Sequence, residues 1–297
     1  PVPARRGPIE APSSQPVDAS FPDSVLRDTI VCPYNEPEHA AALIERHADE
    51  LAAVIVEPVL GSMGMVAATK AFLETLREAT ARHGIVLIFD EVITLRLDTG
   101  GAQALHGITP DLTCMGKIIG GGLPIGAVGG RSELMQLFSP EQENPVMHAS
   151  TFSGNALTMA AGLAAMQAYN ADEAVRINML GNRLRTGFNE AFLQSGIRGQ
   201  AIGSGSLTNL HFTDSPINNA RDSMAGMIDA GQVSRLLHIG MLRRGVMSAS
   251  RLMYCVSTAM SEAEVDIAVG ALNETLRELR PYIEAERPAL LPGGAGA

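Results

Sequence analysis

The stretch that decides the fold runs from Ile85 to Gly130 and reads IVLIFDEVITLRLDTGGAQALHGITPDLTCMGKIIGGGLPIGAVGG. It begins with five apolar residues, Ile85–Phe89, and then turns abruptly to the charged pair Asp90 and Glu91. An apolar run of this length, bounded by charge, predicts a buried strand of a parallel sheet. Because the ligands of open α/β sheets bind at the carboxyl ends of the strands, Asp90 is predicted to face such a site.

Lys117 is the second unusual residue of this stretch. The chain contains two lysines, Lys70 and Lys117, against twenty arginines, and Lys117 stands just before the glycines 120–122. A lysine amine forms a Schiff base with an aldehyde, and burial helps because it favours the neutral amine. Pyridoxal phosphate (PLP) is such an aldehyde, and a carboxylate such as Asp90 would keep its pyridine nitrogen protonated. The pattern is also open to a second interpretation, a solvated loop lysine and a helix-capping aspartate.

The residues before this stretch predict alternating strands and helices. Residues 51–56 (LAAVIV) predict a second buried strand. Residues 69–83 predict an amphipathic helix, with Thr69 as its N-cap and Gly84 as its end. The strand–helix–strand order predicts an α/β fold with a mostly parallel sheet.

The chain is expected to form two domains after a proline-rich start. Residues 1–27 carry five prolines in the first sixteen positions and predict an extended segment. Residues 28–180 are assigned to the large domain, which includes an apolar and therefore buried helix over 155–169. Residues 181–297, with shorter strands and helices and a capping box at Ser261, are assigned to a smaller C-terminal α+β domain.

Composition argues against several classes of partner. The net charge is −10 at pH 7 and no basic block is present, so nucleic acid is not expected as a partner. No apolar run reaches the length that spans a bilayer, so no membrane is expected either. The three cysteines, Cys32, Cys114 and Cys255, lack metal-ligand spacing, which favours a reduced cytoplasm and no metal site.

Three motifs in this order resemble the class III aminotransferases of PLP fold type I. They are LIFDEV (87–92), DLTCMGKIIGGGLPIGAVGG (111–130) and HASTFSGN (148–155). The resemblance runs from about Asp28 to the C-terminus and is nearest to glutamate-1-semialdehyde 2,1-aminomutase and the β-amino-acid aminotransferases. It implies a fold type I large domain that is N-terminally incomplete, PLP as cofactor, and a homodimer with shared active sites.

The resemblance also implies a role for each residue around the cofactor ring. Lys117 would carry PLP as a Schiff base and move the substrate proton, and Asp90 would bind the pyridine nitrogen. Val92 would pack on one face of the ring, which is compatible with its being an ordinary core residue. Glu57, at the end of the strand over 51–56, would reach the same crevice.

Ser150 and Thr151 match the segment that binds the cofactor phosphate of the neighbouring subunit. A hydroxyl and a backbone N–H suit a dianion. The residues alone also allow a simpler interpretation, a Ser/Thr N-cap for the helix that begins near Asn155.

Arg251 resembles the arginine with which β-amino-acid aminotransferases bind a substrate carboxylate, although it could equally be one more surface arginine. Ser62 stands where ornithine- and GABA-type members carry a second glutamate, which argues against those subgroups. The resemblance therefore implies PLP-dependent transfer of an amino group between an amino acid, with a β-amino acid favoured, and a 2-oxo acid such as 2-oxoglutarate or pyruvate.

Two alternatives stay open at this point. One is an aminomutase of the glutamate-1-semialdehyde type. The other is a non-catalytic, truncated fragment of the family, because the phosphate-binding turn and the ring-stacking aromatic that members carry upstream have no counterpart in residues 1–28.

Overall fold

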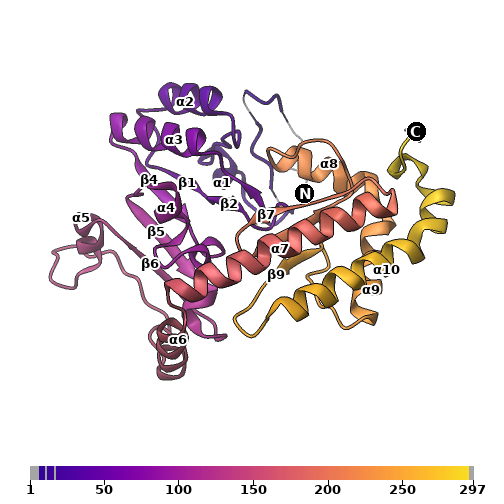
Figure 1. The fold of residues 1–297 in the computed structure, drawn as a ribbon. Coiled ribbons are helices and arrows are strands. Elements are labelled where there is room, and N and C mark those ends of the chain that lie inside the picture. Colours follow the sequence, from indigo (N-terminus) through magenta and orange to yellow (C-terminus); the bar gives the residue numbers. More distant parts are fainter. Residues whose placement is uncertain (1–6, 11, 17, 294–297) are drawn as a thin grey trace. The chain divides into compact units, whose positions relative to one another are not determined.

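The computed structural model describes residues 7–10, 12–16 and 18–293, which group into two compact units (Figure 1). The Lys117 unit consists of Glu36–Pro58 and Ala68–Ala174. The C-terminal unit consists of the chain up to Asn35, the short segment Val59–Ala67, and the chain from Val175 onward. The domain boundaries expected at residues 27 and 180 stay a prediction.

A four-stranded sheet with the order β1-β4-β5-β6 forms the centre of the Lys117 unit. The first three strands, β1 (Ala53–Val56), β4 (Val86–Asp90) and β5 (Leu112–Gly116), run parallel, and β6 (Gly126–Gly130) is antiparallel to β5. The mostly parallel sheet predicted from the sequence is therefore confirmed, and β1 and β4 lie within one or two residues of the ranges expected for them, whereas β5 was not predicted.

Two helices, α2 (Pro37–Arg46) and α3 (Lys70–His83), pack against each other in this unit, as Figure 1 shows. The Thr69 hydroxyl accepts a hydrogen bond from the backbone N–H of Phe72 at 3.2 Å, and Gly84 ends α3 in the left-handed conformation, so both predicted helix signals are confirmed. One face of α3 joins the apolar strand β4 to make a core in which each large side chain contributes roughly 1.5–3 kcal/mol of burial free energy. The largest fully buried members are Phe72, Leu73, Leu76, Leu87, Phe89 and Leu97.

The helix α6 (Ala156–Ala168) is more exposed than its apolar sequence predicts. Leu157 and Leu163 are 77% and 61% exposed, and of the α6 residues only Thr158 and Gly162 are buried. The helix packs by its small residues on the 3₁₀ turn η3 (Lys117–Gly120), where a Cβ on Gly162 would lie 2.2 Å from the Ile119 carbonyl oxygen. The prediction of a buried helix is wrong. Helix α6 contacts η3 through Gly162, and its larger side chains, such as Leu157 and Leu163, stay outside this contact.

The remaining short elements of the Lys117 unit connect the strands. They are η2 (Thr94–Leu97), α4 (Gly101–His106), α5 (Ser132–Met135) and η4 (Gln136–Phe138).

The C-terminal unit is built on an antiparallel three-stranded sheet with the order β7-β8-β9, which confirms its predicted α+β character. Its strands are β7 (Gln200–Ser204), β8 (Leu207–His211) and β9 (Met253–Cys255), with a small hairpin of β2 (Val59–Leu60) and β3 (Val66–Ala67). Its helices are α1 (Asp23–Arg27), α7 (Ala171–Ser195, in this unit from Val175 onward), α8 (Ala220–Ala230), α9 (Gln232–Arg243), α10 (Glu262–Glu286) and η5 (Pro288–Leu290).

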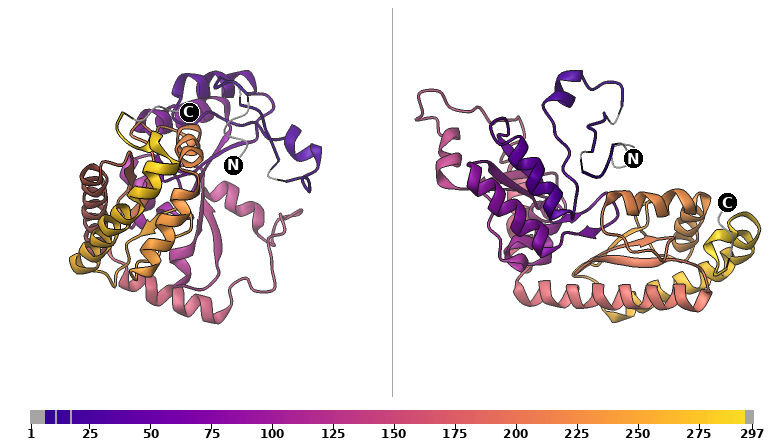
Figure 2. Two further views of the ribbon diagram at one scale, coloured as in Figure 1. Left: turned by 90° about the vertical axis from the view of Figure 1, so that its right-hand side faces the viewer. Right: turned by 90° about the horizontal axis from the view of Figure 1, so that it is seen from above.

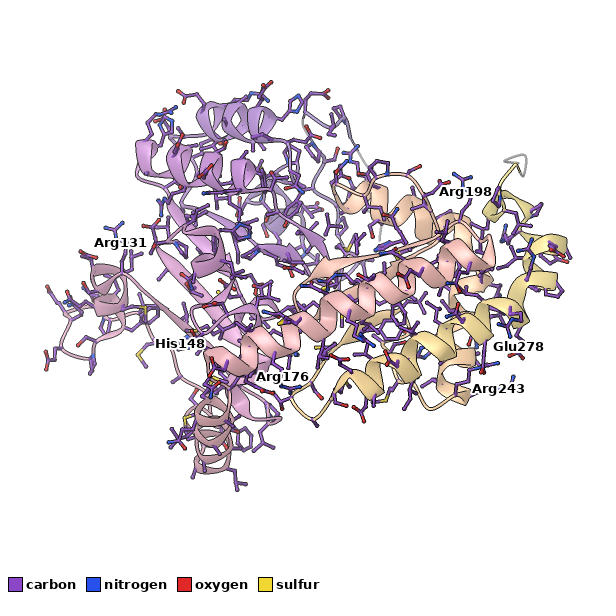
Figure 3. The ribbon with its side chains drawn as sticks, viewed as in Figure 1. Arg131, His148, Arg176, Arg198, Arg243 and Glu278 are labelled. Carbon is purple, nitrogen blue, oxygen red and sulfur yellow. The ribbon has the colours of Figure 1, made fainter. Side chains whose placement is uncertain are left out.

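Helix α7 runs along the sheet of this unit, as the right-hand view of Figure 2 shows. The Asn189 side chain exchanges two hydrogen bonds with the backbone of Ala201, at 2.8 and 3.1 Å. On the other long helix, α10, the predicted capping box of Ser261 and Glu264 is confirmed. An ion pair of 3.2 Å between Arg243 and Glu278 joins α9 to α10 (Figure 3). No helix within the described residues combines the length and apolarity needed to cross a bilayer.

Candidate active site

The parallel strands β1, β4 and β5 bring three predicted site residues to one edge of the sheet. Val56 pairs with Phe89. Glu57, the residue after β1, and Asp90, the last residue of β4, therefore stand at the same end of two adjacent strands. Asp90 in turn pairs with Cys114, and β5 ends two residues later at Gly116, immediately before Lys117. Because the carboxyl ends of parallel strands share an edge, these groups lie where an open α/β sheet binds its ligand.

The half-buried Asp90 carboxylate has one oriented oxygen and one open oxygen. Its Oδ1 accepts a hydrogen bond from the Val92 backbone N–H at 3.0 Å, and no other described residue donates to it. Asp90 caps no helix, because the following turn η2 has Ile93 at its N-cap position and no side-chain cap. The open oxygen therefore suits a cationic N–H donor such as a protonated pyridine.

Lys117 begins η3 with a positive φ of 47°, a conformation that costs an ordinary residue roughly 1–2 kcal/mol. Its side chain is exposed and forms no ion pair with any described residue. A Cβ built on the preceding Gly116 would lie 3.3 Å from a methyl group of Val92, so the half-buried Val92 packs directly against the end of β5. A strained, unpaired lysine at this sheet edge is the kind of residue that serves a function.

Cys114 lies half-buried beside Asp90 at the ends of the strands. Burial, together with a smaller contribution from the Asp90 charge, raises the pKa of the Cys114 thiol. A protonated thiol is a poor nucleophile, so Cys114 acts as a small half-buried residue next to Asp90.

Ser150 and Thr151 lie in an exposed turn before α6. The backbone N–H and hydroxyl of Ser150 contact the Ser153 hydroxyl at 3.2 and 3.0 Å. Neither residue caps α6, because the N-cap is Asn155, whose side chain accepts from the Thr158 N–H at 3.0 Å. Both hydroxyls are therefore free of the capping role, and their phosphate-binding role stays a prediction.

The segment that leads into this turn is held by few contacts. The His148 ring packs edge-on against Phe138 with ring centroids 5.7 Å apart, and Figure 3 labels His148 in this region. The neighbouring Met147 is 83% exposed.

Arg251 belongs to the C-terminal unit and not to the Lys117 unit. It lies in the turn before β9, next to Leu252, which has a positive φ of 64°. Its exposed side chain lines a hollow of about 250 Å³ together with Arg235, Ser234 and Phe212, and it pairs with no described carboxylate. An unpaired guanidinium is available for a carboxylate ligand, and this role of Arg251 stays a prediction.

The structure adds a residue that the sequence analysis did not single out. Glu91 is fully buried, and its carboxylate accepts hydrogen bonds from the Thr94 hydroxyl (2.6 Å) and from the N–H groups of Ala102 (2.8 Å) and Gln103 (2.7 Å). No local pattern reveals it, because the two backbone donors lie eleven and twelve residues further along the chain.

Asp111 is a second residue that the sequence analysis did not single out. It connects β4 to the start of β5, to Arg77 of α3 and to Arg131. Its carboxylate accepts from the Leu87 N–H at 2.7 Å and pairs with Arg77 at 3.0 Å and Arg131 at 3.1 Å. Burial alone would raise the pKa of Asp111, but these hydrogen bonds and charges outweigh it and hold the pKa below its usual range. Asp111 is thus a buried anion that fixes the strand from which Asp90 emerges.

The residues of the Lys117 unit fit the ring and aldehyde of PLP. Asp90 offers an open carboxylate oxygen, and Lys117 offers an amine without an ion-pair partner among the described residues. For the phosphate, the unit offers the two exposed hydroxyls of Ser150 and Thr151.

Comparison with known proteins agrees with this geometry. The profile of the family described as aminotransferase class-III matches residues 11–276. The chain belongs to the class III aminotransferase family. The sequence-based resemblance is thereby confirmed, as is PLP as the cofactor of this family, since one similar structure is a transaminase with PLP bound.

Relatives of two kinds are similar to this class III chain. A glutamate-1-semialdehyde 2,1-aminomutase from Thermomicrobium roseum is 40% identical over 261 residues, which cover 86% of this chain and 60% of the relative. An omega-transaminase from Sphaerobacter thermophilus is 42% identical with a TM-score of 0.88, over 93% of this chain and 63% of that one. A β-phenylalanine aminotransferase from Variovorax paradoxus is 35% identical with a TM-score of 0.83, over 96% and 63%. The chain thus spans about three fifths of the length of these relatives.

Proposed function

We propose that this chain supplies the lysine and the pyridine-binding carboxylate of a PLP-dependent enzyme that transfers an amino group between an amino acid and a 2-oxo acid. The observation that carries this proposal is the sheet edge itself. Asp90, with one oxygen held by the Val92 N–H and one open, ends the strand next to the strand that leads into unpaired Lys117.

Each residue has a defined task in this proposal. PLP supplies an electron sink, which makes the C–H bond next to a bound amine acidic. The open oxygen of Asp90 keeps the pyridine nitrogen protonated. The Lys117 amine would hold the aldehyde and, once released, would move a proton between the substrate's Cα (or Cβ) and C4′ of the cofactor. Val92 packs on the ring face, Glu57 lines the same edge, and Ser150 and Thr151 bind the phosphate.

A β-amino acid is the favoured amino donor. The unpaired Arg251 suits a bidentate carboxylate, and similarity to a β-phenylalanine aminotransferase and an omega-transaminase supports this branch. The acceptor would be a 2-oxo acid such as 2-oxoglutarate or pyruvate.

A second function is favoured by a different observation. Two curated relatives, from Thermomicrobium roseum and Clostridium novyi, are glutamate-1-semialdehyde 2,1-aminomutases that are 40% and 38% identical to this chain, and an aminomutase would take amino group and acceptor carbon from one substrate. The third alternative is a chain without activity of its own, which is supported by its covering about three fifths of its relatives.

For assembly and location, we propose a cytoplasmic homodimer. Its support is the exposed apolar side chains beside Thr151, among them Phe152 at 78% and Leu157 at 77%, which a second copy could cover. Three free cysteines agree with a reducing compartment.

An isotope experiment separates the three alternatives. PLP-loaded protein is mixed with ¹⁵N-labelled β-phenylalanine and 2-oxoglutarate, and separately with ¹⁵N-labelled glutamate-1-semialdehyde without acceptor. Label in glutamate supports the aminotransferase, and 5-aminolevulinate formed without acceptor supports the aminomutase. If neither product forms while PLP remains bound, the chain is inactive by itself.

A further inference from the structure

Glu91 is a buried anion held only by hydrogen-bond donors. Among the described residues no arginine, lysine or histidine lies within ion-pair distance of its carboxylate. Burying a charge is costly unless polar partners replace water, and here a hydroxyl and two backbone N–H groups do so. Both N–H groups belong to the first turn of α4, so Glu91 ties the end of β4 to a helix that begins ten residues later.

The space around this carboxylate is closely filled. Gly101, with a φ of +75°, lies so close that a Cβ at this position would be 2.8 Å from Glu91 Oε1. The side chain consequently has little freedom to rotate without losing its three donors.

The backbone of Glu91 is held as firmly as its side chain. Its N–H donates to the Cys114 carbonyl at 2.9 Å, which continues the β4–β5 pairing one residue beyond Asp90. Its carbonyl accepts from the Leu95 N–H at 2.9 Å. Strand β4 ends at Asp90 and the chain turns at Val92, so a fixed Glu91 fixes the start of the turn whose Val92 N–H holds the Asp90 carboxylate.

We propose that Glu91 is a positioning residue for Asp90: its buried carboxylate locks the turn from which Asp90 presents its open oxygen to the pyridine nitrogen. This inference rests on the proposed cofactor role of Asp90. It predicts that a change at Glu91 weakens the ring-nitrogen contact specifically, and not only the stability of the fold.

A pair of cofactors tests this distinction. PLP and its 1-deaza analogue, in which a CH group replaces the ring nitrogen, differ only in the group that Asp90 contacts. We expect the protein to bind PLP at least about tenfold more tightly than the analogue, because the contact is a charge-assisted hydrogen bond. Asp90→Asn should remove most of this preference, and Glu91→Gln should reduce it by about threefold.

Matched variants separate positioning from general damage. Glu91→Asp keeps the carboxylate and should retain part of the preference for PLP. Thr94→Val, which removes one donor, should show a preference between that of the wild type and that of Glu91→Gln. Glu78→Gln, at an exposed glutamate of the same unit, should leave the preference unchanged. If Glu91→Gln weakens PLP and the analogue by the same factor, Glu91 has a merely structural role and the proposal is overturned.

Amide hydrogen exchange tests the same inference without cofactor. The Val92 N–H reports the hydrogen bond to Asp90 Oδ1, and the N–H of the buried residue Leu73, on the amphipathic helix α3, reports the fold. We expect Glu91→Gln to speed exchange at Val92 by about tenfold or more while Leu73 stays protected. Unchanged exchange at Val92 overturns the proposal, even if the chain alone binds neither cofactor and the proposed function fails.

Discussion

Two segments expected to contact the same cofactor are held in opposite ways. The turn that carries Asp90 and Glu91 is fixed by sheet pairing, a helix start and a buried carboxylate. The turn that carries Ser150 and Thr151 is exposed, and the hydrogen bonds of Ser150 stay within the turn. The Lys117 unit therefore positions the Asp90 carboxylate by its own contacts, whereas we expect the Ser150 and Thr151 hydroxyls to need another surface to bind a phosphate.

The largest effect should come from crowding the Glu91 carboxylate. Gly101→Ala places a methyl group 2.8 Å from Glu91 Oε1 and imposes a left-handed conformation on alanine. We expect a loss of about 2–5 kcal/mol in the free energy of unfolding, measured by urea denaturation.

Gly107→Ala is the matched control. Gly107 also has a positive φ, but a Cβ there meets nothing within 4 Å, so the cost should be about 1–2 kcal/mol. Equal losses for the two variants would contradict the close packing around Glu91.

Acid should destabilise the Lys117 unit by protonating Asp111. Its pKa in the folded protein is lower than in the unfolded chain, where a carboxyl titrates near about 4. The stabilisation is therefore complete above about pH 4 and is lost as the pH falls through the lower folded value. Urea denaturation between pH 6 and about pH 3 should show a smaller acid loss for Asp111→Asn than for the wild type, because the variant has already lost this contribution.

An exposed pair in the other unit provides the comparison for Asp111. Asp214 also pairs with an arginine, Arg198, which Figure 3 labels. The Asp214 side chain is 59% exposed. Asp214→Asn should change the free energy of unfolding by less than about 1 kcal/mol. A loss as large as that of Asp111→Asn would show that burial does not distinguish the two sites.

A smaller effect is expected at the start of α6, just after the turn that carries Ser150 and Thr151. Asn155 caps this helix, and Asn155→Ala should cost about 1 kcal/mol by removing the acceptor of the Thr158 N–H. Thermal unfolding measures it, and a change near zero would mean that α6 frays already in the wild type.

The smallest effect on stability is expected at Thr151. Its exposed side chain has no described hydrogen-bond partner, so Thr151→Ala should change the free energy of unfolding by no more than about 0.5 kcal/mol. If the hydroxyl binds the cofactor phosphate, the same variant should weaken PLP binding by about tenfold. A large loss of stability without a change in PLP affinity would remove Thr151 from the site.

The sequence predicted the elements whose signals are local. The apolar run before Asp90, the Thr69 cap, the end of α3 at Gly84 and the capping box at Ser261 all depend on neighbouring residues, and all are confirmed. Family motifs added the roles of Lys117 and Asp90, which periodicity alone leaves open.

The features that escaped prediction depend on contacts distant in sequence. Glu91 and Asp111 receive donors from segments up to 34 residues away, and neither motif nor periodicity reveals such pairs. The exposure of α6 was missed for a similar reason, because Gly162 packs against Ile119 and leaves Leu163 outside. An apolar sequence indicates that a helix could be buried, but the partner decides which face is covered.

Borohydride reduction tests the central claim most directly, because the chain has only two lysines, Lys117 and Lys70. The protein is incubated with PLP, reduced, digested and mapped by mass spectrometry, with Lys117→Ala and Asp90→Asn alongside. We predict a stable adduct on the peptide that contains Lys117 and none on Lys70, whose amine pairs with Glu74 at 3.6 Å. The adduct should vanish in Lys117→Ala and require more PLP in Asp90→Asn. No adduct at saturating PLP, or equal labelling of both lysines, would contradict the assignment of Lys117 as the cofactor-binding lysine.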